Sequence, residues 1–223
     1  TVYGESFSSL TDRKEADVVK DMALAMAKKV ASKIGKALFK AKRNASGTKT
    51  MDLFNGFDTI AATEITAKTI STANGNLFIY ETITAANAGD QLKAIYAAAS
   101  DELKEQENLK MYIPQTVLDK YEEWCLATLG AVAYNQTYAQ NKLHCNRNVD
   151  IVPMVGLKDS EYIYFSTKEN MLVGVDQLSD TEKAKIRECD NPKALQFFMC
   201  LYWGVQFESI QKEILLVART TAE

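Results

Sequence analysis

The sequence predicts an α+β fold in which helices pack against a central sheet. Three observations support this prediction: a long stretch with helical periodicity near the start, alternating helical and strand patterns in the middle, and aromatic-rich runs typical of strands towards the end. From the order of these patterns we expect the long helix and the last strand to form a layer apart from the central sheet.

The long helical pattern runs from residue 10 to residue 43, with Gly35 as its only glycine and no proline. Its apolar side chains recur on one helical face, at Val19, Met22, Ala23, Met26, Val30, Ile34 and Ala37. A helix of roughly 34 residues is about 50 Å long. A compact ball of this chain length is about equally wide. We therefore expect an elongated molecule or a surface helix, with a shape that partner molecules complete.

Shorter patterns follow the long helix. In the first half they predict a tight turn at 52–60 around Gly56, a turn at Asn74–Gly75, a helix over 84–106, a strand over 109–113, and a helix over 115–130 after Pro114. Residues 131–147 are polar and predict an exposed loop. Strands are predicted at 149–155, 162–165, 171–175 and 213–218, with a buried strand or an interface at 194–207. The pattern at 180–189 is compatible with a helix or with an extended edge.

Composition favours a soluble globular protein: 47% of the 223 residues are hydrophobic and 25% are charged. The net charge of -3 gives no overall attraction to nucleic acid, although the first helix is locally basic. No apolar run is long enough to predict a membrane span. The chain begins with Thr1 and shows no signal peptide, so we expect a processed, trimmed or cloned form.

Conventional chemical motifs are absent, and we expect no enzyme, no cofactor and no metal. The four cysteines are far apart and the one histidine is His144, which offers little for zinc, so reduced cytosolic thiols are expected. No phosphate-binding glycine loop, nucleophile elbow or HExxH helix occurs. Two alternatives stay open: a small enzyme using His144, Cys145 and Asp150, and a binding module using the tyrosines at 134–138.

Several segments occur in an order found in a known family. They are Leu53-Phe54-Asn55-Gly56-Phe57-Asp58-Thr59-Ile60, Met111-Tyr112-Ile113-Pro114, Tyr162-Ile163-Tyr164-Phe165-Ser166, Asn170-Met171-Leu172-Val173-Gly174-Val175-Asp176 and Trp203-Gly204-Val205-Gln206-Phe207. Together with the long helix, this order resembles that of tailed-bacteriophage major capsid proteins with the Hong Kong 97-type fold. The resemblance implies a peripheral domain at 1–51 with a spine helix, an axial domain with a central sheet at 52–200, and a strand at 201–223 that returns to the peripheral domain.

The resemblance also implies a function. The chain would be a structural subunit of an icosahedral phage or prophage capsid that encloses double-stranded DNA. Its partners would be copies of itself in pentamers and hexamers, packaged DNA bound non-specifically, and a portal, scaffold or protease, with no membrane. It would reside in the virion capsid, and in the bacterial cytoplasm during assembly. An encapsulin-like nanocompartment shell is the related alternative.

Two groups of residues are expected at the interfaces between subunits. Polar residues of the predicted loop should be exposed and mobile in an isolated subunit, because their partners would be other copies, and basic residues of the long helix should face partners or DNA. The candidates are Tyr134, Asn135, Tyr138, Asn141, Lys28, Lys29 and Lys36. Only nine residues precede the predicted helix, so the resemblance implies a trimmed form or a short prophage-borne version.

Overall fold

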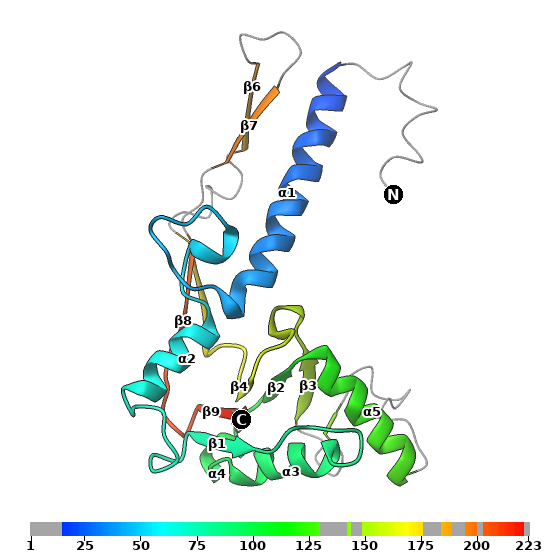
Figure 1. Cartoon of the computed structure of the whole chain (residues 1–223), viewed down its shortest axis with the longest axis vertical. Coiled ribbons are helices and arrows are strands. Elements are labelled where there is room, and N and C mark those ends of the chain that lie inside the picture. Colours follow the sequence, from blue (N-terminus) through cyan, green and yellow to red (C-terminus); the bar gives the residue numbers. More distant parts are fainter. Residues whose placement is uncertain are drawn as a thin grey trace. The chain divides into compact units, whose positions relative to one another are not determined.

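The computed structural model of the chain describes residues 15–129, 142–143, 149–175, 184–188, 195–199 and 203–220. It confirms the α+β class, with helices and a mixed sheet (Figure 1). The chain divides into two compact units. The small unit comprises residues 1–34 and 175–203, and the large unit comprises residues 35–174 and 204–223.

A five-stranded mixed sheet is the centre of the large unit, with strand order β1-β9-β4-β2-β3. The strands are β1 Leu77–Tyr80, β2 Lys110–Ile113, β3 Asp150–Pro153, β4 Tyr162–Ser166 and β9 Leu215–Thr220. The pairs β1–β9 and β2–β3 are parallel, and β4 runs antiparallel to both of its neighbours. All five residues of β4 are buried, so the sheet has material on both of its faces.

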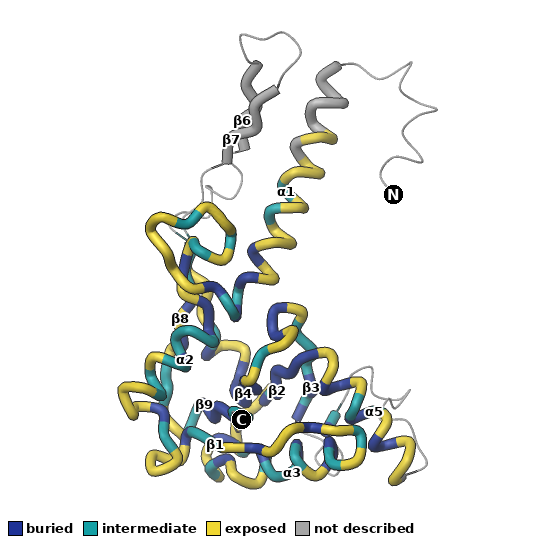
Figure 2. The backbone as a smooth tube through the Cα atoms, in the orientation of Figure 1, coloured by how far each residue is buried: buried dark blue, intermediate teal, exposed yellow. Residues whose placement is uncertain are grey.

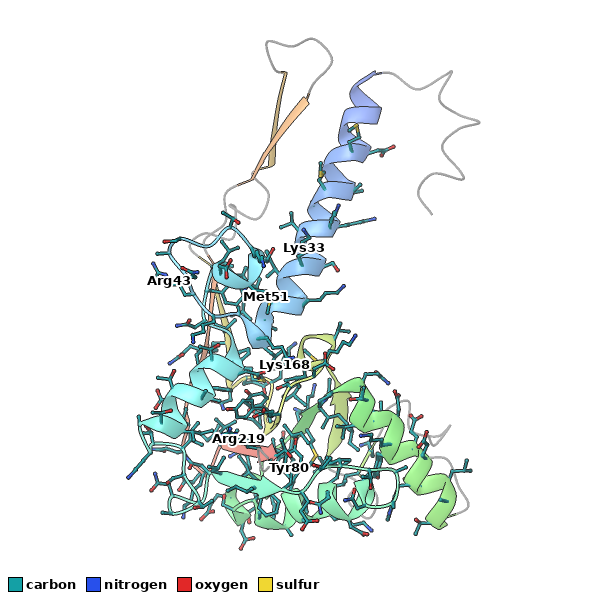
Figure 3. All side chains as sticks on the ribbon, in the orientation of Figure 1. Lys33, Arg43, Met51, Tyr80, Lys168 and Arg219 are labelled. Carbon is teal, nitrogen blue, oxygen red and sulfur yellow. The ribbon has the colours of Figure 1, made fainter. Side chains whose placement is uncertain are left out.

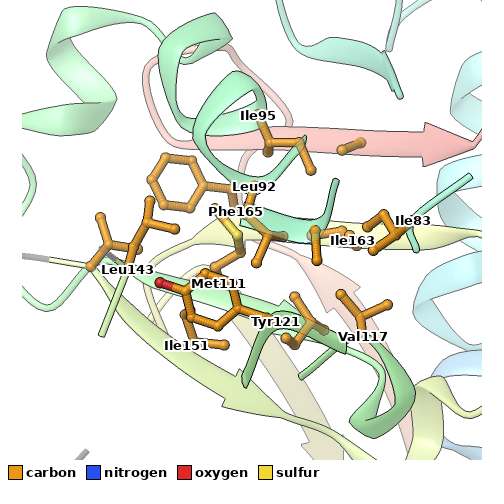
Figure 4. Close-up of a cluster of buried hydrophobic side chains, with 14 of the residues drawn as sticks. Ile83, Leu92, Ile95, Met111, Val117, Tyr121, Leu143, Ile151, Ile163 and Phe165 are labelled. Atoms are coloured by element: carbon orange, nitrogen blue, oxygen red, sulfur yellow. The ribbon is translucent and has the colours of Figure 1, made fainter. Parts of the chain in front are cut away.

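One face of the sheet carries the main hydrophobic core. It is covered by α3, Ala88–Ala98, and by α5, Gln115–Leu129, which begins directly after Pro114 as predicted. Leu92 and Ile95 of α3 join Phe165 of the sheet in this cluster (Figure 4). Side chains alternate between the two faces of a strand, so the tyrosines at 162 and 164 belong to the opposite face.

The opposite face is associated with α2, Phe57–Thr66, with the last turns of α1, Glu15–Lys40, and with β8, Trp203–Phe207. The strand β8 also pairs with β5, Met171–Val175, in a two-stranded sheet. The remaining helical segments of the described residues are α4 Asp101–Lys104, η1 Thr50–Asp52 and η2 Val155–Leu157.

The small unit contains the first part of α1 and a hairpin. Its strands are β6, Ala184–Glu188, and β7, Leu195–Met199, which pair antiparallel. The sequence pattern left 180–189 open between helix and extended edge, and the structure places a strand at 184–188. The aromatic-rich stretch 194–207 forms two strands, β7 and β8.

The long helix ends earlier than predicted. Within the described residues α1 extends over Glu15–Lys40, three residues short of Arg43. The carbonyl of Ala41 accepts the backbone N–H of Gly56 and the hydroxyl of Thr59, each at 2.7 Å. These tertiary hydrogen bonds occupy the group that a further helical turn would use.

The helix predicted over 84–106 is two helices. Two residues lie between them, and both are extended: Ala99 has a ψ of 149° and Ser100 a ψ of 157°. Ser100 is the residue directly before α4. Its hydroxyl accepts the backbone N–H of Leu103 at 3.1 Å and thereby caps α4. Leu92 and Ile95 of α3 and Leu103 of α4 are fully buried.

The last strand was predicted to lie in a layer apart from the central sheet, and this prediction was wrong. The strand β9 lies inside the sheet, between β1 and β4. Four consecutive residues of β9, 215–218, are apolar and buried. Such an uninterrupted apolar run is typical of a strand covered on both faces.

Candidate assembly surface

An aromatic cluster within the large unit packs the last turns of α1 against α2, β4 and β8. The rings of Phe39 on α1 and Phe57 on α2 have their centroids 5.5 Å apart. The ring centroid of Phe57 lies 4.9 Å from that of Phe207 on β8, and the ring centroid of Phe207 lies 5.7 Å from that of Tyr164 on β4. Gly56 makes this packing possible, because a Cβ at that position would overlap the carbonyl of Phe39. The turn predicted at 52–60 is shorter than expected, because α2 begins at Phe57; Phe54 and Phe57, on either side of Gly56, are buried.

A half-buried carboxylate lies beside the aromatic cluster. The Oδ1 atom of Asp58 accepts the hydroxyl of Tyr164, and Oδ2 accepts the hydroxyl of Ser160, both at 2.7 Å. Burial raises the pKa of Asp58, while the two hydroxyl donors and the charge of Lys40 oppose that rise. Burial also raises the pKa of Tyr164 well above its ordinary value. Since both oxygens already have donors, the group acts as an anchor between α2 and β4.

The segment after α1 is held in one shape by its own hydrogen bonds. The backbone N–H of Lys42 donates to the carbonyl of Met51, and that of Arg43 donates to Oδ1 of Asn55, each at 2.9 Å. Figure 3 labels Arg43 and Met51 on this segment. Lys42, Arg43 and Lys49 are exposed, so the loop displays their charges to solvent.

The predicted interface lysines of α1, Lys28, Lys29 and Lys36, are exposed. Figure 2 shows that much of the described part of α1 is exposed. The three lysines belong to a larger set, which we name the basic stretch and define as residues 22–51. It contains eight basic and no acidic side chains: Lys28, Lys29, Lys33, Lys36, Lys40, Lys42, Arg43 and Lys49. The sequence pattern had indicated a locally basic helix, and the loop of Lys42 to Lys49 extends that charge beyond it.

The apolar face of α1 is covered only towards its end. Ile34 and Ala37 are buried, with exposed fractions of 8% and 0%. Met22 and Met26, about three and two turns before Ile34 on the predicted face, are 48% and 45% exposed, and Val30 is half-buried. We name Met22, Met26 and Val30 the uncovered face of α1. Exposed apolar side chains in a helical row are typical of a contact surface.

Most other candidate residues lie outside the described parts of the chain. These are Tyr134, Asn135, Tyr138, Asn141, His144 and Cys145. Asp150 of the enzyme alternative is described: it is half-buried on β3, and its Oδ1 lies 3.5 Å from Nζ of Lys142.

Among the described residues, no three histidine, cysteine or acidic side chains gather as metal ligands would. Cys125, the cysteine within the described ranges, is a buried free thiol whose pKa burial raises. No helix in the described parts of the chain has the length and apolar character needed to cross a membrane.

Comparison with solved structures identifies the fold. Over 99% of its length this chain matches 68% of a chain in the structure described as "Satellite phage P4 procapsid including size determination (Sid) protein", with a TM-score of 0.61. The chain has a capsid-type fold. At 11% sequence identity, this similarity concerns the fold alone. The capsid-type part of the family resemblance is thereby confirmed.

Two weaker similarities carry no further argument. One, to "Mycobacterium phage Che8", has 9% identity and a TM-score of 0.39 and covers 74% of this chain and 63% of the other. The other, to "Crystal structure of virus-like particle from Pyrococcus furiosus", has 11% identity and a TM-score of 0.37 and covers 76% of this chain and 64% of the other. No protein-family model and no curated protein matches the chain.

Proposed function

We propose that the chain is a structural subunit of an icosahedral phage or prophage capsid of the Hong Kong 97 type, and that it works by self-assembly rather than by catalysis. The observation that supports this proposal most is the fold shared with a procapsid chain over nearly the whole length. A shell subunit repeats the same contacts around symmetry axes, so it needs extended surfaces rather than a cleft.

The described surface offers such contacts. The uncovered face of α1 presents apolar side chains in a row, and burial of apolar surface stabilises by about 25 cal/mol per Å². On β5, the neighbouring residues Leu172 and Val173 are 47% and 46% exposed. Neighbouring strand residues point to opposite faces, so both faces of this two-stranded sheet lack cover there. A two-stranded sheet is marginally stable alone, and a neighbouring copy would cover it.

The arrangement within the shell is also part of the proposal. We assign residues 1–51 to the peripheral domain and 52–200 to the axial domain, while β9 joins the central sheet instead of returning to the periphery. The proposed partners are other copies of the chain, packaged double-stranded DNA, and a portal, scaffold or protease. The proposed location is the virion capsid, after assembly in the bacterial cytoplasm.

The interface role of the predicted loop stays a prediction. Its residues Tyr134, Asn135, Tyr138 and Asn141 lie outside the described ranges, so their test is functional. Substitution of both tyrosines by serine should reduce assembly without changing the unfolding of the isolated chain. Unchanged assembly would remove this loop from the proposed interface.

Electron microscopy of concentrated purified protein tests the shell proposal. We expect closed particles of uniform size. A chain that stays monomeric at high concentration would overturn the proposal and would favour the binding-module alternative.

A matched pair of variants locates the contact. M26E places a charge on the uncovered face of α1, and S32E places the same charge on another exposed side of the same helix. We expect M26E to fold normally but to form no particles, because a charge buried at an apolar contact is costly. S32E should assemble. Particle formation by both variants would exclude the uncovered face as a contact.

A further inference from the structure

The charges of this chain are strongly segregated. The basic stretch carries eight basic and no acidic side chains within 30 residues. The remaining 193 residues therefore carry 18 basic and 29 acidic side chains, so the near-neutral total conceals one strongly positive segment in an acidic chain. A positive segment of this kind is the electrostatic footprint expected of a protein that binds a polyanion.

Four of these lysines lie on one side of α1. Lys29, Lys33, Lys36 and Lys40 are spaced i, i+4, i+7 and i+11, which is one face of a helix. We name them the lysine row; at 1.5 Å per residue it is about 16 Å long. Lys29, Lys33 and Lys36 are exposed, and Figure 3 labels Lys33 on the ribbon of α1.

Three of the four lysines of the row have no acidic partner within the described structure, whereas Lys40 interacts electrostatically with the carboxyl of Asp58. No ion pair joins Lys29, Lys33 or Lys36 to an acidic residue there. Like charges three or four residues apart destabilise a helix by about 0.2–0.5 kcal/mol per pair. A bound polyanion would remove this repulsion.

The remaining side chains of the stretch indicate how such a partner is recognised. Its one aromatic residue, Phe39, is fully buried, so nothing there can stack on an unpaired base. Seven of its eight basic residues are lysines and one is an arginine, Arg43. The ammonium group of lysine acts as a point charge, without the planar fork by which arginine selects the geometry of its partner. These properties fit a continuous phosphate backbone and do not fit base reading or single-strand binding.

We propose that the basic stretch binds the phosphate backbone of double-stranded DNA without sequence selectivity, with the lysine row along the duplex and Lys42, Arg43 and Lys49 as additional contacts. Duplex DNA carries one negative charge per about 1.7 Å of its axis. The lysine row can therefore contact phosphates at any position along the duplex. This deepens the proposed function, on which it rests, by naming the surface that would face packaged DNA.

The test is a titration of the full-length chain with a fluorescent random-sequence duplex at several salt concentrations. If the four lysines each neutralise one phosphate, the plot of log K against log salt should have a slope of about −3.6 or steeper. K33Q/K36Q should reduce the magnitude of that slope by about 1.8. The control K168Q/K212Q removes two exposed lysines outside the basic stretch and should leave the slope unchanged.

Three further arms define what would overturn the proposal. Duplexes of different sequence should bind equally, a single strand should bind more weakly, and polyglutamate should compete less well than duplex DNA at equal charge. Preferential binding of polyglutamate would assign the stretch to an acidic protein instead. Binding that is absent, or unaffected by K33Q/K36Q, would also overturn it. Particle formation is scored in the same samples, so particles without DNA binding would reject this site and leave the shell proposal standing.

Discussion

At the scale of single residues, Asp58 is a polar group that joins α2 to β4 and to Ser160 by hydrogen bonds. D58A would leave the hydroxyls of Tyr164 and Ser160 without their acceptor, so we expect the free energy of unfolding to fall by about 3 kcal/mol. D58N keeps an acceptor for Tyr164 and offers Ser160 a donor, so it should cost about 1 kcal/mol. Urea denaturation measures both, and equal losses would contradict the anchoring role.

The same carboxyl gives a pH dependence whose sign follows from its environment. Burial raises the pKa of Asp58 above its ordinary value of 3.8, so the folded chain holds this proton more tightly than the unfolded chain. The resulting stabilisation is complete below pH 3.8 and is lost as the pH rises through the raised pKa. The free energy of unfolding of the wild type, relative to D58N, should therefore increase from pH 7 to pH 4. A difference that is constant with pH would contradict this prediction.

The anchor also shows why sequence alone could not predict this part of the structure. Asp58 was included in the turn predicted at 52–60, whereas the structure places it in the first turn of α2. Its partner Tyr164 is 106 positions away along the chain. No local pattern links two residues at such a separation, because their contact depends on how β4 is placed in the sheet.

At the scale of helices, two glycines predict substitutions of opposite sign. A Cβ at Gly89 on α3 would overlap the ring of Trp124 on α5, whereas a Cβ at Gly35 on α1 would meet nothing within 4 Å. G89A should therefore separate the two helices and lower the free energy of unfolding by about 2 kcal/mol. G35A should raise it by up to about 1 kcal/mol, the difference in helix propensity.

Thermal or urea unfolding of both variants measures this pair, and the far-ultraviolet circular dichroism of each folded variant checks that its helices remain. Trp124 fluorescence supplies a local reading, since its ring is buried against α3 and lies under Nζ of Lys93 at 4.8 Å. A shift of that fluorescence in G89A but not in G35A would place the perturbation between α3 and α5. Equal changes in the free energy of unfolding of G89A and G35A would contradict the close approach of Gly89 to the ring of Trp124.

Helices and strands were predictable where local sequence signals determine their bounds. They were less predictable where tertiary contacts determine them. Pro114, the apolar spacing after it and the short runs around it correctly predicted β2 and α5. The end of α1 depends on Gly56 and Thr59 reaching back to Ala41, a contact that no helix-stop signal encodes. Ser100 was a recognisable cap inside a continuous apolar pattern, and here the cap prevailed over the periodicity.

The candidate surface was predictable in part for a similar reason. Charge and helical spacing are readable along a chain, so the exposure of Lys28, Lys29 and Lys36 follows from the amphipathic pattern of α1. The spacing of residues does not predict how much of the apolar face of α1 other parts of the protein cover. Met26 and Ile34 have equivalent spacing in the sequence, yet only Ile34 is buried.

At the scale of the whole molecule, the order of the strands is the feature that the sequence did not predict. The last strand, β9, separates β1 from β4, although about 50 residues of chain lie between β4 and β9. A continuous apolar run is typical of any buried strand. Such a run predicts that the strand is buried, but it does not predict which strands lie beside it. The five-stranded sheet is therefore incomplete until residues 215–220 have been synthesised.

This topology makes removal of β9 a decisive change. Truncation after Ser209 would remove the strand with which β1 pairs among the described residues, and it would uncover the residues of β4 that pair with 215–219. We expect the truncated chain to lose cooperative unfolding and its slowly exchanging amides in β4, because β4 would become an edge strand. Removal of residues 221–223, which follow β9, is the control and should change neither. Hydrogen exchange measures both chains, and a protected β4 in the longer truncation would show that the sheet forms without its last strand.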